Sequence, residues 1–126
     1  MIDALFNQPS YLAAKRELDA VALRQEAIAS NIANLETPGY QRVDLAPGFQ
    51  QELERACASG DPAQIAALKP TLAVDPSAVP SSRDGNTVHL ENELMQMDQN
   101  TMVNALETQF VGSMLSRMRL AITGKS

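Results

Sequence analysis

Two long stretches of the chain carry apolar residues at the spacing of an amphipathic helix. In the first stretch, from Ser10 to Leu35, apolar side chains recur at alternating gaps of three and four residues, and Gln25 interrupts the pattern. Pro9 and Ser10 are predicted to begin this helix, with Ser10 as the capping residue, and residues 1–8 are expected to form a mobile lead. The apolar positions are Tyr11, Ala14, Leu18, Val21, Ile28, Ile32 and Leu35.

The second stretch extends from residue 90 to 122 and carries a wider apolar stripe. The stripe is too wide for one partner helix and predicts contact with two or more neighbours. Glu91 and Glu93 in the first turn suit the helix dipole and are interpreted as solvated charges, and Thr123 and Gly124 end the helix. The first apolar line holds Leu90, Leu94, Met97, Met102, Leu106, Phe110, Met114, Met118 and Ile122, and the second holds Met95, Val103, Val111 and Leu115.

The segment between the two stretches has a different character. Residues 49–57 are compatible with a short helix that places Phe49 and Leu53 on one side, and residues 63–68 with one further turn of helix. Beyond them, Pro70, Pro76 and Pro80 lie among small and polar residues, which is typical of extended, weakly ordered chain. The first helix is about 37 Å long at 1.5 Å per residue, so only another long helix is expected to cover it.

These patterns predict an all-α fold. The long N-terminal and C-terminal helices are expected to pack as an antiparallel coiled coil, joined by a largely irregular, proline-rich middle segment. The predicted parts are residues 1–40, 41–83 and 84–126, which together form one axial-core domain. A heptad stripe alone is equally typical of an ordinary core between two helices, but these two stripes exceed what a two-helix hairpin can bury, which favours contacts between molecules.

Composition excludes several classes of function. The 126 residues carry a net charge of −5, which argues against nucleic-acid binding. Cys57 is the single cysteine, so neither an internal disulfide nor a cysteine-built zinc site is possible, and His89, the single histidine, lacks a catalytic partner in the pattern. No run approaches the roughly 20 apolar residues of a membrane helix. We therefore expect no enzyme activity, no cofactor, no metal and no small-molecule substrate.

A motif ends the first helix. Pro38 disfavours helical backbone at Thr37, and Gly39 permits the positive φ that a sharp turn requires. The residues of the motif, in their order along the sequence, closely resemble the N-terminal signature of the bacterial flagellar rod and hook proteins. They are Asn31, Ile32, Ala33, Asn34, Thr37, Pro38, Gly39 and Tyr40.

A second motif precedes the last helix. Asp84, Gly85 and Asn86, followed by Thr87 and Val88, resemble the segment before the C-terminal helix in the proximal-rod members of that family. Two departures occur: His89 replaces a frequent acidic residue, and Val103-Asn104 stands where a tyrosine-glutamine pair is common. The resemblance covers about residues 10–45 and 84–123.

The resemblance implies a structural subunit of the proximal rod, which assembles with copies of itself and other rod proteins to transmit torque. It further implies export without a cleaved signal peptide, location in the periplasmic rod, and contact with a FliE-type adaptor or the export gate. The first motif would set the angle at which the chain leaves the inner helix, and Phe49 and Leu53 would belong to an export-recognition segment. The residues expected in helix packing or assembly are Leu18, Val21, Ile28, Ile32, Leu94, Leu106, Phe110, Met114, Leu115 and Met118.

One alternative of another class remains open at this point. A cytoplasmic helical adaptor or a type III secretion chaperone would also be small, acidic and helical. The rod subunit and the chaperone would differ in cellular location and in folding of the isolated protein. A rod subunit is secreted and partly disordered when isolated, whereas a chaperone is a folded cytosolic dimer.

Overall fold

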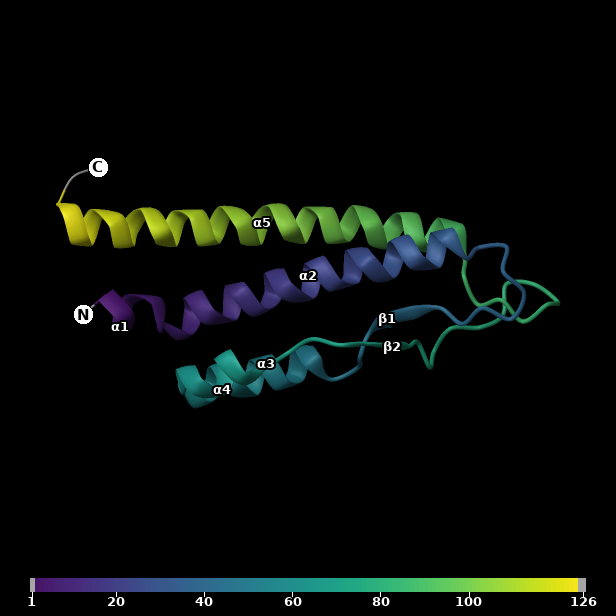
Figure 1. Cartoon of the computed structure of the whole chain (residues 1–126), viewed down its shortest axis with the longest axis horizontal. Coiled ribbons are helices and arrows are strands. Elements are labelled where there is room, and N and C mark those ends of the chain that lie inside the picture. The colour runs from purple at the N-terminus through teal and green to yellow at the C-terminus, as the bar shows by residue number, and fades with distance from the viewer. Residues whose placement is uncertain (1, 125–126) are drawn as a thin grey trace.

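Helices dominate the computed structural model, which describes residues 2–124. α2 and α5 lie side by side and run in opposite directions, and the middle segment returns along the other side of α2 (Figure 1). α2 is therefore the central layer of the molecule. In chain order the elements are α1 (Ile2–Phe6), α2 (Pro9–Ala33), β1 (Val43–Leu45), α3 (Phe49–Ser59), α4 (Pro62–Ala67), β2 (Leu72–Val74) and α5 (Leu90–Thr123).

The start of α2 differs from the prediction. Pro9 occupies the first helical turn, where its fixed φ and missing N–H are tolerated, and Gln8 is the capping residue with extended backbone and no side-chain capping bond. The predicted cap at Ser10 is therefore wrong. The expected mobile lead is helical in α1, and the Phe6 ring meets Tyr11 edge-on at 5.8 Å between centroids. Met1, which belonged to that lead, lies outside the described residues.

The middle segment covers one side of α2. The predicted short helices are confirmed as α3 and α4, and the Asp61 carboxylate caps α4 by accepting a 3.0 Å bond from the N–H of Ala63. Their apolar sides form the main core with α2, so the expectation that only another long helix would cover α2 is wrong. This core contains Leu12, Ala20, Phe49, Leu53, Ala56 and Ile65, with Ala13, Leu45 and Leu68 packed around it.

A small antiparallel sheet, absent from the prediction, connects the short helices to the rest of the molecule. β1 pairs with β2 in the register Val43 to Val74 and Leu45 to Leu72. Pro70 and Pro76 flank β2 rather than interrupt it. The fold is thus predominantly helical with a two-stranded sheet, and the middle segment is more ordered than the predicted irregular linker.

The contact between α2 and α5 explains the interruptions in both apolar stripes. The Asn100 amide of α5 donates to the carbonyl oxygen of Val21 at 3.0 Å and to Gln25 Oε1 at 3.1 Å. Gln25, which breaks the first stripe, therefore pairs with a polar residue that lies between Met97 and Met102 of the second. The predicted end of α5 is confirmed at Gly124, whose N–H donates to Leu120.

Truncating the core between α2 and the short helices tests whether the middle segment is structural. Ile65 is fully buried, so Ile65→Ala is expected to lower the free energy of unfolding by about 2–5 kcal/mol. The matched control is Val79→Ala at an exposed loop position, which should change it by less than about 0.5 kcal/mol. Urea denaturation measures both, and equal effects would mean that α4 does not pack on α2.

Candidate functional site: the polar junction of the two long helices

The first motif forms the turn after α2. Asn34 is the C-cap residue; its amide donates to the carbonyl oxygen of Ser30 at 2.9 Å, and its side-chain oxygen accepts a 3.1 Å bond from the Thr37 hydroxyl. Gly39 adopts a φ of 70°, as the predicted turn requires. Thr37, Pro38 and Gly39 are solvent-exposed, so these three residues fix the backbone direction rather than fill a core.

The second motif closes the same end of α2. The Asn86 amide donates to the carbonyl oxygens of Asn34 at 2.9 Å, Leu35 at 3.0 Å and Thr37 at 2.8 Å. These carbonyls lie past the last helical turn, where intrahelical partners run out. Asp84 in turn accepts hydrogen bonds from the Ser82 hydroxyl and from the N–H of Asn86, and these bonds lower the pKa of Asp84. Two motifs about 50 residues apart therefore form one structure.

Asn31 ties the last turn of α2 to β1. Its amide donates to the carbonyl oxygen of Val43 at 2.8 Å, and its side-chain oxygen accepts from the N–H of Val43 at 2.9 Å. This two-way pairing imitates a neighbouring strand. The same amide donates to Glu93 Oε2 at 3.2 Å, and the same oxygen accepts from the Tyr40 hydroxyl at 3.3 Å. Asn31 is fully buried and uses both ends of its side chain.

A buried ion pair joins Arg42, the residue before β1, to the first turn of α5. Glu93 is 0% exposed, and its Oε1 accepts a 2.5 Å bond from Arg42 Nε. The interpretation of Glu93 as a solvated charge is therefore wrong, because its partner lies 51 residues earlier and neither helical spacing nor composition links the two. Burial disfavours the charged guanidinium, but the hydrogen bond and charge of Glu93 outweigh it and raise the pKa of Arg42.

The remaining donors of Arg42 hold the sheet. Nη1 reaches Asp75 Oδ2 at 2.7 Å and Asp44 Oδ2 at 3.1 Å, and Arg24 of α2 pairs with the other oxygen of Asp44 at 3.0 Å. A hydrogen bond from the Ser77 hydroxyl outweighs burial and lowers the pKa of Asp75. One guanidinium thus binds three carboxylates, and these ion pairs tie β1, β2 and α5 together.

The structure separates the predicted packing residues into two groups. Val21, Ile28 and Met118 are buried, and Leu18, Ile32 and Met114 are half-buried within the single chain. The other four predicted residues, all on α5, remain exposed: Leu94, Leu106, Phe110 and Leu115. Ala33, the last residue of α2, is also exposed, whereas Gly85 is half-buried beside Gly39.

Sequence reasoning missed Arg42, Glu93 and Asn100 as structural residues. For Asn100 a signal existed, because a polar residue in an apolar stripe opposite Gln25 indicates a polar pair. Thr87, whose hydroxyl accepts from the N–H of Arg42 at 2.7 Å, was recognised only as part of the motif.

Residues 2–124 contain no group of three or more His, Cys, Asp or Glu side chains placed to hold a metal ion. Nor does any helix in that range combine the length and apolar character that a membrane crossing requires.

Breaking the buried ion pair tests its role in stability. Glu93→Gln removes the buried charge paired with Arg42 Nε, while Asp44 and Asp75 remain partners of Arg42, and is expected to lower the free energy of unfolding by about 1.5–3 kcal/mol. Glu91→Gln, an exposed change in the same helical turn, is the matched control and should cost less than about 0.5 kcal/mol. Chemical denaturation compares the two, and similar midpoints for both variants would contradict the assigned role.

Changing Asn86 tests how the two motifs meet. Asn86→Ala removes the amide that donates to three carbonyl groups, of which those of Asn34 and Thr37 keep a backbone N–H donor, and is expected to cost about 1–3 kcal/mol of stability. Asn86→Asp should cost more, since a carboxylate oxygen would then face those carbonyl oxygens. Asn92→Asp, exposed on α5, makes the same chemical change as a control. Thermal unfolding ranks the variants, and an Asp variant as stable as the Ala variant would exclude this arrangement.

The chain resembles one set of known proteins. The family model described as flagella basal body rod protein matches residues 14–41. FlgB of Escherichia coli K12 is 35% identical over 118 residues, covering 77% of this chain and 84% of that protein. FlgB of Borrelia hermsii is 32% identical over 112 residues, covering 75% and 82%, and FlgB of Salmonella typhimurium LT2 is 32% identical over 123 residues, covering 85% and 88%.

The family model covers most of α2 and the turn after it, and it ends one residue before Arg42. The chain belongs to the FlgB family of flagellar basal body rod proteins.

Proposed function

We propose that this chain is a structural subunit of the proximal flagellar rod, where it packs against copies of itself and other rod proteins and transmits torque. The observation that carries the proposal is the exposed apolar surface of α5. Family membership supports it independently and favours this role over a cytoplasmic adaptor or secretion chaperone. A purely structural subunit also has no need of a catalytic site.

Most of the exposed large apolar side chains among the described residues lie on α5. The helix has 34 residues and is therefore about 51 Å long, but α2 contacts only one of its sides. Met102 is 67% exposed and Leu106 62% exposed. We call the exposed apolar side chains on the side of α5 opposite Glu93, Asn100 and Met118 the outer face of α5; they are Leu94, Met95, Met102, Leu106 and Leu120. Burying a side chain of this kind stabilises an interface by about 1.5–3 kcal/mol.

The outer face of α5 also suggests how the parts of the chain are arranged in the rod. In the rod, α2 and α5 would form an antiparallel coiled coil whose outer face meets neighbouring copies. Residues 1–40 and 84–126 would make the axial core, and residues 41–83 would lie against it. The junction motifs would hold α2 and α5 at a fixed angle, which suits a subunit that transmits force.

Location and further partners are part of this proposal. Family membership supports export through the flagellar type III apparatus without a cleaved signal peptide, and residence in the periplasmic rod. It also supports contact with a FliE-type adaptor or the export gate at the base of the rod. Phe49 and Leu53, proposed from the sequence as an export signal, are buried against α2, so they would be available for recognition only in the unfolded, exported chain.

A charged substitution on the outer face distinguishes an effect on assembly from an effect on folding. Leu106→Asp is expected to leave expression and the unfolding midpoint unchanged, because the side chain is exposed, but to abolish rod assembly and swimming. Gln51→Asp adds the same charge at an exposed position of α3 and should swim normally. Motility in soft agar and isolation of basal bodies measure both variants. Normal swimming of Leu106→Asp would contradict the proposed function.

A further inference from the structure

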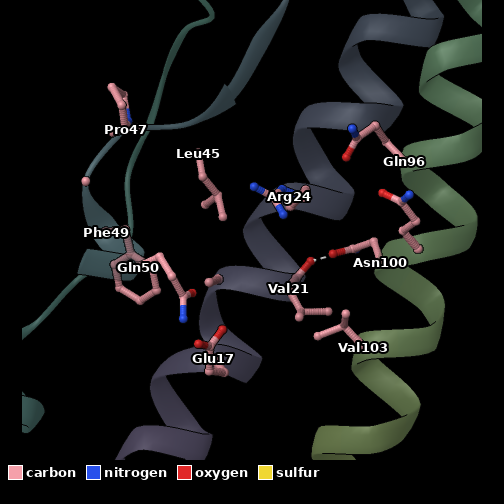
Figure 2. Close-up of a pocket in the computed structure, with 14 residues that line it drawn as sticks. Glu17, Val21, Arg24, Leu45, Pro47, Phe49, Gln50, Gln96, Asn100 and Val103 are labelled. Atoms are coloured by element: carbon pink, nitrogen blue, oxygen red, sulfur yellow. Dashed lines mark hydrogen bonds between the residues drawn. The ribbon is translucent and has the colours of Figure 1, made fainter. Parts of the chain in front are cut away.

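A groove follows α2 between α5 and α3. Its central part has a volume of about 490 Å³ and is lined by Ala13, Ala14 and Glu17 of α2, by Leu53 and Glu54 of α3, and by Glu107 and Phe110 of α5. It continues past Glu17 towards Arg24, where α5 lies on one side of α2 and Phe49 and Gln50 on the other (Figure 2). At the other end it passes Phe110 towards Met118.

The charge of the groove is negative and uncompensated. Glu17, Glu54 and Glu107 have no ion-pair partner among the residues that the structure describes. Burial is the main cause that raises the pKa of Glu107, and the charge of Glu17 adds to it. Arg24, at one end, is already paired with Asp44. The groove therefore offers an apolar floor and carboxylates to an amphipathic, basic ligand.

The same chain carries a segment of that chemistry. After Glu107 the sequence has no acidic residue, but it contains Arg117, Arg119 and Lys125. Leu115, Arg119 and Ile122 follow one another at spacings of four and three residues, so they share one face of α5, and all three are exposed. Neither Arg117 nor Arg119 forms an ion pair within residues 2–124.

The lengths also agree. At 1.5 Å per residue, residues 108–123 of α5 span about 23 Å, and the groove floor from Ser10 to Arg24 spans about 21 Å. A chain cannot place this segment in its own groove, because its own α5 forms one wall. The segment that fits must come from another molecule.

We propose that the groove binds the basic C-terminal end of α5 from a second copy of the chain. Leu115 and Ile122 lie against the apolar floor, and Arg119 pairs with the carboxylates of Glu54 and Glu107. The two surfaces differ, so the contact is head-to-tail and continues from copy to copy instead of closing a dimer. This inference rests on the proposed function and adds to it which surface of one subunit meets which surface of the next.

Cross-linking tests the contact directly, because Cys57, the only cysteine, lines the groove and is exposed. In the full-length Ile122→Cys variant, a short bismaleimide is expected to give a ladder of covalent oligomers at high protein concentration and in isolated basal bodies. The unmodified chain should give no ladder. Adding Glu54→Lys or Arg119→Glu should lower the ladder yield about tenfold, and combining both should restore it. Glu52→Lys, exposed on α3 outside the groove, is the matched control and should leave the yield unchanged.

The groove contact is overturned if the ladder is absent from both preparations, or if it survives both single charge reversals unchanged. It is equally overturned if Glu52→Lys lowers the yield as much as Glu54→Lys does. These outcomes leave the rod function standing as long as Leu106→Asp abolishes swimming. Normal swimming of Leu106→Asp with an intact ladder would instead overturn the proposed function and leave the contact between copies.

Discussion

The buried carboxylate of Glu93 is the group on which the arrangement of the two long helices depends. One oxygen accepts from Arg42, which follows the turn after α2, and the other accepts from Asn31 in the last turn of α2. An ionised carboxylate without such partners is very costly to bury. These bonds are satisfied only if α5 begins beside the end of α2, within reach of Arg42 just before β1. Asn86 adds to this requirement by capping the three carbonyl groups past α2.

The molecule has two contrasting regions: the junction, where polar groups are paired within the chain, and the exposed side of α5. At the junction, the chain supplies partners for its own charges and amides. Along α5, by contrast, apolar side chains such as Met102 and Leu106 have no cover from the same chain. A subunit of this design keeps its own helix angle while it leaves contact surface to its neighbours. Both properties are useful in a rod that carries torque, where small interfaces share the load.

The sequence predicted the long helices well, because their apolar spacing is a local property, and the turn at Pro38 and Gly39 follows from local backbone restrictions. The short helices at Phe49 and Ile65 were also recognisable. Their packing on α2 was not, since it depends on how the chain between Leu45 and Phe49 turns back. The β1–β2 pairing was missed for the same reason: three-residue strands carry no periodic signal, and their register is set by contacts such as Asn31 with Val43.

The motifs could be read from the sequence, but their joint role could not. Asn86 and Asn34 were identified separately, and only the fold brings the Asn86 amide to the end of α2. Glu93 was misinterpreted because its position in a first helical turn is explained equally well by the helix dipole. Arg42, 51 residues away, is the partner that changes the interpretation. Long-range ion pairs of this kind have no signature in a single sequence.

Methionine oxidation in assembled and isolated protein tests the division between the closed junction and the open side of α5 most directly. Met95 is 51% exposed on the outer face of α5, whereas Met118 is 6% exposed against the rest of the chain. In the isolated chain, Met95 and Met102 should be oxidised rapidly and Met118 slowly, since access governs the rate. In intact basal bodies all three are expected to be protected. Equal reactivity of Met95 and Met102 in the two states would contradict the account.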